Sequence, residues 1–283
     1  MAQEIAKSES LQEKAETLLS LHRGSKILVL INAWDVASAR LVEHLGFPAV
    51  ATSSAAVANS LGYPDGERIS RNEMLNVVER ITSAVHVPVT ADMEAGYARD
   101  PEQMADTARE LIEAGAVGLN LEDSLENESR LVDVKLQVEK IKAVRSIAEI
   151  AHVPLVLNAR TDAYWWKGAD PKTRLAETMR RANIYREAGG DCIFVPGLVD
   201  KDEISRLLKE SPGPLNILGS MPGAPSIREL QELGVARVSL GAGPYRTALG
   251  AFRRLAHELL ESGTYRMLAE TAIPSPEMKR LLE

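Results

Sequence analysis

Acidic side chains follow three successive apolar runs of the chain: Asp92 and Glu94 after the first, Glu122 after the second and Asp162 after the third. Asp92 and Glu94 are two residues apart, so their side chains project from the same side of an extended strand. Carboxylates held this close repel one another unless a cation or raised pKa values relieve the repulsion. Oxygen ligands without a neighbouring His or Cys favour Mg²⁺ or Mn²⁺ over zinc. We therefore expect bound Mg²⁺ or Mn²⁺; the alternative is that these carboxylates are helix caps and surface charges.

Arg160 follows the third of these runs and should lie beside the acidic side chains. An arginine in that position can bind a substrate carboxylate through two parallel hydrogen bonds or stabilise a developing oxyanion. A structural ion pair with Glu122 or Asp162 is the other interpretation, and the two are compatible. The five histidines precede strands or lie in helical patterns. We therefore expect chemistry based on metal, carboxylate and arginine, without a histidine base.

The elements that must position these residues are predicted by a repeated alternation. Short apolar runs occur at 27–31, 49–52, 87–91, 117–121, 155–158, 192–195, 215–218 and 238–240. Amphipathic stretches with helical spacing separate most of them, which is typical of parallel strands joined by helical crossovers. The alternation predicts one α/β domain over residues 1–283, a (β/α)8 TIM barrel, in which chemistry takes place where the strands end. The connections 53–68 and 123–134 are candidate active-site loops.

Composition narrows the class of protein. The net charge is −7 and no basic patch is evident, so we expect no nucleic-acid partner. Neither a signal peptide nor an apolar run of the roughly 18 residues that a membrane span needs is present. We expect no membrane partner and a cytoplasmic location. The single cysteine, Cys192, lies in an apolar run and is expected to be an inert core thiol.

Six short motifs occur in order along the chain: Asn32-Ala-Trp-Asp35, Thr52-Ser-Ser54, Leu61-Gly-Tyr-Pro-Asp-Gly66, Asp92-Met-Glu94 with Gly96-Tyr97, Leu121-Glu-Asp123 and Asn158-Ala-Arg160. The set resembles the phosphoenolpyruvate mutase/isocitrate lyase superfamily across residues 26–245. The resemblance implies a (β/α)8 barrel that forms dimers or tetramers, usually with its last helix swapped between subunits. The segment from about 247 to 283 would supply that helix.

The resemblance also implies roles for matching residues. Asp92 would be the central metal ligand, mostly through waters, with Glu94 and Glu122 as further ligands. Asp65 would be a loop carboxylate that approaches the metal, and Arg160 would hold the substrate; we take Arg160, Asp65 and Glu122 as candidate catalytic residues. The candidate substrate-binding residues are Ser53, Ser54, Ala55, Asp92, Arg160 and Asn216.

The loop after the fourth run separates this chain from some members of the family. Cysteine-dependent lyases carry a Cys and a His there, whereas this chain reads Asp123-Ser-Leu-Glu-Asn-Glu-Ser-Arg130. Phosphonomutases place Lys and Asn in the same loop, at positions where Glu128 and Arg130 stand here.

A small 2-oxo acid, or a related di- or tricarboxylate, is the expected substrate. We expect C–C cleavage through a metal-stabilised enolate, by oxaloacetate-type decarboxylation or a retro-aldol reaction. The alternatives are a C–P bond enzyme (phosphonopyruvate hydrolase or phosphoenolpyruvate phosphonomutase) and a non-catalytic 2-oxo acid binding protein.

Overall fold

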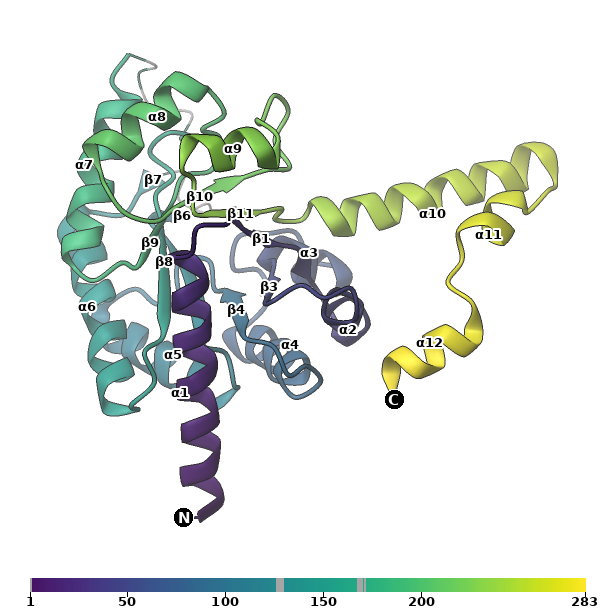
Figure 1. Ribbon diagram of the computed structural model, residues 1–283, viewed down its shortest axis with the longest axis horizontal. Helices are drawn as coiled ribbons and strands as arrows, with labels where there is room; N and C mark the ends of the chain where they lie inside the picture. Colours follow the sequence, from purple (N-terminus) through teal and green to yellow (C-terminus); the bar gives the residue numbers. More distant parts are fainter. Residues whose placement is uncertain (1, 126–129, 167–169, 171) are drawn as a thin grey trace.

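The computed structural model describes residues 2–125, 130–166, 170 and 172–283, and it shows a ring of parallel strands surrounded by helices (Figure 1). The strands of the ring are β1 (Leu28–Leu30), β2 (Asn32–Ala33), β3 (Val50–Thr52), β4 (Val89–Asp92), β5 (Gly118–Glu122), β8 (Val156–Arg160), β9 (Cys192–Phe194), β10 (Leu215–Leu218) and β11 (Arg237–Ser239). Their order is β1-β11-β10-β9-β8-β5-β4-β3-β2, and all the pairings are parallel. The predicted (β/α)8 barrel is confirmed.

The first strand of the barrel is interrupted. β1 pairs with β11 and β2 pairs with β3, and Ile31 alone separates the two segments. The Asn32 side chain bridges this seam, because its Nδ2 donates to the Thr52 carbonyl at 2.6 Å and its Oδ1 accepts from the Leu240 N–H at 2.8 Å. The predicted first run at 27–31 therefore extends to Ala33, and the nine segments occupy eight barrel positions.

The helices follow the strands in the expected alternation. They are α1 (Ala2–His22), α2 (Val36–His44), α3 (Ser54–Ser60), α4 (Arg71–Thr82), α5 (Pro101–Glu113), α6 (Val134–Ile150), α7 (Arg174–Glu187), α8 (Lys201–Glu210), α9 (Ile227–Leu233), α10 (Gly243–Ser262), α11 (Arg266–Thr271) and α12 (Ser275–Leu282). The candidate loop 53–68 contains α3, and the candidate loop 123–134 begins with an antiparallel hairpin of β6 (Ser124–Leu125) and β7 (Arg130–Leu131).

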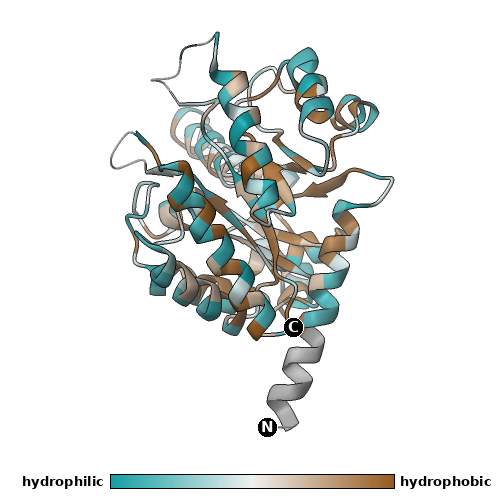
Figure 2. Ribbon diagram, turned by 90° about the vertical axis from the view of Figure 1, so that its left-hand side faces the viewer, coloured by the Kyte–Doolittle hydropathy of each residue, from teal (hydrophilic) through white to brown (hydrophobic). Residues whose placement is uncertain are grey.

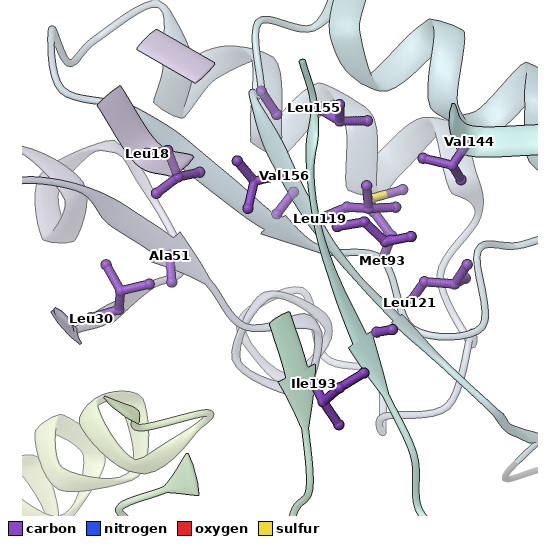
Figure 3. Packing of buried hydrophobic residues seen from close by; sticks show 14 of the residues in the cluster. Leu18, Leu30, Ala51, Met93, Leu119, Leu121, Val144, Leu155, Val156 and Ile193 are labelled. Carbon is purple, nitrogen blue, oxygen red and sulfur yellow. The ribbon is translucent and has the colours of Figure 1, made fainter. Parts of the chain in front are cut away.

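The two faces of the strands differ in polarity. Outward-facing Leu119 and Leu121 belong to the main hydrophobic cluster, with Val144 of α6 among its members (Figure 3). The hydropathy colouring shows apolar strands at the centre and hydrophilic outer faces on the helices (Figure 2). Between these leucines, Asn120 faces into the barrel, where Arg237 of the distant strand β11 reaches its Oδ1 at 3.4 Å. Polar residues therefore occupy part of the barrel interior, which in this fold is usually filled by branched apolar side chains.

Helix α1 covers the amino-terminal end of the barrel. Leu11, Ala15 and Leu18 on this helix are buried, and Figure 3 shows Leu18 with Val156 among the core side chains. Gly118 permits this packing, because a Cβ at that position would lie 2.8 Å from Leu18 Cδ2. A side chain at this position would therefore require Leu18 or Thr90 to shift.

The chain leaves the barrel at α10. This 20-residue helix has no buried residues and extends away from the strands, after which α11 and α12 turn back and α12 contacts α2 (Figure 1). Within the residues that the structure describes, no helix is long and apolar enough to cross a membrane.

His22, at the end of α1, is buried in its neutral form. Its Nδ1 donates to the Leu18 carbonyl at 2.7 Å, and its Nε2 lies 3.4 Å from Arg237 Nη1. Burial, with a smaller contribution from the Arg237 charge, lowers the pKa of His22 to about 4. Between this value and the ordinary histidine pKa of about 6.5, the unfolded chain binds a proton that the folded chain does not.

Acid should therefore destabilise the protein partly through His22. The stabilisation that neutral His22 contributes is complete above about pH 6.5. It is lost as the pH falls toward 4, which lowers the free energy of unfolding by about 3 kcal/mol in total. Urea unfolding at pH 7 and pH 4.5 measures this loss, and His22→Gln should show a smaller one than the wild type. His86→Gln, at a side chain that is 91% exposed, is the matched control. An equal acid-induced loss in His22→Gln and the wild type would contradict the prediction.

Candidate active site

Asp92 is the last residue of β4 and lies at the centre of a group of polar contacts. Its Oδ2 accepts hydrogen bonds from the Ser54 backbone N–H at 3.1 Å and from Ser54 Oγ at 3.0 Å. Its Oδ1 accepts from Asn120 Nδ2 at 3.2 Å. The side chain is only 8% exposed, so these donors replace the water that a carboxylate would otherwise bind.

Glu94 lies two residues beyond Asp92 in a backbone turn of unusual conformation. Glu94, Gly96 and Tyr97 all have φ values in the left-handed region, and two of them carry side chains that disfavour it. The Glu94 carboxylate accepts from the Glu67 N–H at 2.6 Å and from the Tyr97 hydroxyl at 3.0 Å. In return, Glu67 Oε1 accepts from the Tyr97 N–H at 2.8 Å. These reciprocal bonds hold the turn in its strained form and join it to the segment before α4.

Burial dominates the electrostatics of Glu94. It raises the pKa of this carboxyl to about 8, with further increases from the negative charges of Asp65 and Asp92. Burial likewise raises the pKa of Glu122 well above its ordinary value, although the nearby Arg160 opposes the shift. The expected crowding of like charges is thus present, and a bound cation would relieve it.

Arg160 ends β8 and joins two of the acidic residues. Its Nη1 lies 2.5 Å from Glu122 Oε2, and its Nε and Nη2 donate to the two Asp162 oxygens at 2.7 and 2.9 Å. The rings of Trp165 and Phe194 lie 5.9 and 5.8 Å from the guanidinium carbon. This position is therefore compatible with both interpretations of Arg160, a structural ion pair and a substrate-binding residue. The side chain is ion-paired, yet it remains 16% exposed.

A buried hydrogen-bond network connects Asp162 to helix α7 through Asp123. Asp123 Oδ1 accepts from the Asp162 N–H at 2.8 Å, and its Oδ2 accepts from Arg181 Nη1 at 2.9 Å and from the Tyr185 hydroxyl at 2.7 Å. Both partners of Oδ2 lie on α7, so this helix fixes the end of β8 and, through Asp162, the orientation of Arg160.

The other predicted site residues are placed as follows. Ser54 Oγ, which contacts Asp92, also lies 3.3 Å from Asp65 Oδ1, so Asp65 reaches the group from the connection between α3 and α4. Ser53 caps α3 by accepting from the Ala56 N–H, and Ala55 lies in the first turn of that helix. The Asn216 side chain is hydrogen-bonded inside the barrel to Ser239 instead of to the acidic group. The fold thus brings every predicted residue except Asn216 to the Asp92 end of the barrel.

The donor set fits a hydrated hard cation. Asp92, Glu94 and Glu122 supply only oxygen atoms, which suits Mg²⁺ or Mn²⁺. Across the described residues, no three Asp, Glu, His or Cys side chains are arranged to hold a metal ion directly. Each carboxylate oxygen of these three residues already accepts from a protein group but retains further lone pairs. Ligation partly through water is consistent with both observations.

Three residues of the site were not assigned a role from the sequence. Asn120 contacts Asp92, and Tyr97 and Glu67 hold Glu94. Asn120 could have been found, because it precedes Glu122 by two residues and therefore shares its face of β5. The contact between Glu67 and Glu94 joins two loops and has no signature in local spacing.

The fold and the site define an α/β barrel with a group of carboxylates whose oxygen atoms suit a hard cation, and comparison with known proteins identifies its family. The family described as phosphoenolpyruvate phosphomutase matches residues 18–260. A crystal structure of a candidate lyase/mutase from Burkholderia cenocepacia J2315 has a TM-score of 0.89 and 36% identity, and covers 96% of both chains. The chain therefore belongs to the phosphoenolpyruvate mutase/isocitrate lyase superfamily, as predicted, and it is an enzyme.

Two further relatives carry named activities. Oxaloacetate decarboxylase from Bradyrhizobium diazoefficiens is 31% identical over 75% of this chain and 72% of its own length. Phosphonopyruvate hydrolase in complex with oxalate and Mg²⁺ is 25% identical, with a TM-score of 0.83, and covers 95% of this chain and 94% of its own. Related enzymes therefore include ones that act on C–C and on C–P bonds.

Lys140 of α6 should stabilise the strained turn that carries Glu94. Its Nζ is buried and donates to the Ala95 and Ala98 carbonyls at 3.0 and 2.7 Å. Lys140→Met removes both bonds and should cost about 2 kcal/mol of unfolding free energy, because two buried carbonyls lose a charged donor. Hydrogen exchange of the 94–98 amides should also become faster.

Lys142→Met is the matched control on the same helix, since this lysine is 58% exposed and pairs with Glu139 at the surface. It should change the unfolding free energy by less than about 0.5 kcal/mol. Urea unfolding and hydrogen exchange measure both variants. Unchanged exchange at 94–98 in Lys140→Met would contradict the assigned role.

Proposed function

We propose that this protein is a Mg²⁺-dependent lyase that cleaves a C–C bond of a small 2-oxo acid or a related di- or tricarboxylate. The observation that carries the proposal is the group of buried carboxylates at the end of the barrel, with Arg160 beside it. The sequence similarity to an oxaloacetate decarboxylase supports the same reaction class. Oxaloacetate-type decarboxylation and retro-aldol cleavage both belong to that class.

Asp92, Glu94 and Glu122 would hold the cation. When bound, a divalent cation supplies Lewis acidity toward a keto oxygen and neutralises the negative charge that develops there. The chain's own residues bind and orient the acid. Arg160 can attract the substrate carboxylate, because only part of its hydrogen-bonding capacity is directed at Glu122 and Asp162.

The amino-terminal turn of α3 offers a second anion contact. The Ala55 backbone N–H precedes the first intrahelical hydrogen bonds and the Ser53 hydroxyl lies beside it, whereas the Ser54 N–H already donates to Asp92. Asp65 is half-buried and contacts Ser54, so it can exchange a proton with solvent while touching the site. We assign Asp65 as a catalytic carboxylate on this basis, and Glu122 because it lies beside Arg160 in the acidic group.

A C–P bond enzyme is the second candidate. It is favoured by the family description and by the structural similarity to phosphonopyruvate hydrolase. The loop that distinguishes these activities includes Glu128, which lies outside the described residues, and Arg130, which lies in β7. The substrate assay therefore has to separate the two classes.

The test is incubation with Mg²⁺ and, separately, oxaloacetate, methyl-substituted malates and phosphonopyruvate, following pyruvate or another 2-oxo acid product. We expect product from a C–C substrate and none from the phosphonate. Turnover of the phosphonate alone would favour the C–P bond enzyme over the C–C lyase. No turnover, together with tight oxalate binding, would instead favour a non-catalytic 2-oxo acid binding protein.

Asp92→Ala supplies the metal control. It should abolish metal binding and activity, because it removes the carboxylate that Ser54 and Asn120 orient. Asp106→Ala, at an exposed side chain of α5, should leave both unchanged. Full activity of Asp92→Ala without added metal would show that the metal assignment is wrong.

We also propose that the segment from 247 to 283 is exchanged between subunits of a dimer or tetramer. Leu249, Phe252 and Leu259 of α10 are exposed and spaced so that they share one helix face. A groove of about 1140 Å³ lies where α10 leaves the barrel, and its lining includes Ile31 and Leu240. An exposed apolar stripe beside an apolar groove supports pairing with a second copy of the chain.

Sedimentation velocity tests this assembly. The wild type should sediment as a dimer or tetramer, and Phe252→Ser should shift it toward the monomer, because a 69%-exposed aromatic side chain would leave the interface. Arg254→Ser, at an exposed polar position on the same helix, should not. A wild-type monomer at micromolar concentration would contradict the proposal.

A further inference from the structure

Arg237 is a buried cation without an ion-pair partner. It is the first residue of β11 and is 1% exposed, and within the described residues no carboxylate forms an ion pair with it. Its Nη1 faces His22, its Nη2 approaches Asn120, and its Nε has no hydrogen-bond partner. A charge in this state is costly to bury. Apolar replacement of buried charges is often neutral or favourable to stability, so stability alone does not account for it.

Arg237 is connected to the acidic group through the side chain of Asn120. Asn120 Oδ1, which Arg237 approaches at 3.4 Å, also accepts from Asn158 Nδ2 at 2.6 Å. The amide nitrogen of the same Asn120 side chain donates to Asp92 Oδ1. Asn158 and Arg237 together therefore favour the orientation of the Asn120 amide that directs its nitrogen at Asp92. Burial lowers the pKa of Arg237 to about 10, and Cys192 and Asp92 act in the opposite direction.

The charges of the site show what Arg237 contributes. The buried carboxylates that count toward the site are those of Asp92, Glu94, Glu122 and Asp162, because the buried Asp123 is already paired with Arg181. Against these four negative charges stand two guanidinium groups, those of Arg160 and Arg237. When all are ionised, two negative charges remain, which one divalent cation would balance. Without Arg237 the site would retain one negative charge after binding the cation, and it would repel an anionic substrate.

We propose that Arg237 is a positioning and electrostatic residue of the metal site, which limits cation affinity and favours binding of an anionic acid. The inference rests on the proposed function, because it takes the substrate to be a carboxylate bound beside a cation. Its signature is a pair of opposite effects. Loss of the positive charge should tighten cation binding and weaken anion binding, whereas simple structural damage would weaken both.

The experiment compares the wild type with Arg237→Met and Arg237→Lys. The Mn²⁺ dissociation constant is measured from the electron paramagnetic resonance of free Mn²⁺, and the oxalate constant by calorimetry at saturating Mn²⁺, both at pH 8. Arg237→Met should bind Mn²⁺ about tenfold more tightly and oxalate about tenfold more weakly. Arg237→Lys should fall between the wild type and Arg237→Met for both constants, because the burial that lowers the pKa of Arg237 would also remove part of the charge of a lysine there.

Arg145→Met is the matched control, because Arg145 is a largely buried arginine that pairs with Asp191 and the Leu155 carbonyl, away from Asp92. It should lose stability in urea and leave both dissociation constants unchanged. If Arg237→Met does not fold, Arg237→Gln is the second neutral variant.

Weaker or unchanged binding of both ligands by the folded neutral variant would overturn the inference alone. Failure of the wild type itself to bind Mn²⁺ and oxalate would overturn the proposed function and the inference together.

Discussion

The balance of buried charge at the carboxyl ends of the strands is the constraint on which the rest of the site depends. Asp92, Glu94 and Glu122 are removed from water by the fold, and their repulsion is opposed directly by Arg160. In a medium of low polarity such a group is stable only when each charge is hydrogen-bonded and the total is compensated. The serine and asparagine donors around Asp92 meet the first condition, and a bound cation would complete the second.

Residues outside the acidic group hold its side chains in place through buried hydrogen bonds. Asp123 and α7 hold Asp162, which in turn holds Arg160. Lys140 of α6 holds the turn at Glu94 from outside the barrel. The functional side chains therefore stand on rigid elements that are fixed by buried polar contacts, as a site requires when small displacements of charge change binding.

The polar barrel interior links the carboxyl ends of the strands, where the candidate active site lies, to their amino-terminal ends. Most TIM barrels fill this space with branched apolar side chains. Here the contacts run from His22 on α1 through Arg237 and Asn120 to Asp92. The helix that closes the amino-terminal end thus contacts the same network as the proposed metal site. The hydrogen bonds that these groups make with one another offset only part of the cost of burying them, since Arg237 Nε has no hydrogen-bond partner among the described residues.

The sequence determined the barrel, because apolar runs and helical spacing are local properties that recur along the chain. It also determined which residues stand at the strand ends, so the order of residues was enough to identify Asp92, Glu122 and Arg160. Tertiary structure alone decided which groups satisfy them: Glu67 reaches Glu94 from another loop, Lys140 reaches a turn 42 residues away and Arg237 reaches Asn120 across the barrel. It also directed Asn216 toward Ser239 instead of the acidic group. Local spacing specifies the direction of a side chain, whereas its partner depends on how distant strands and loops meet.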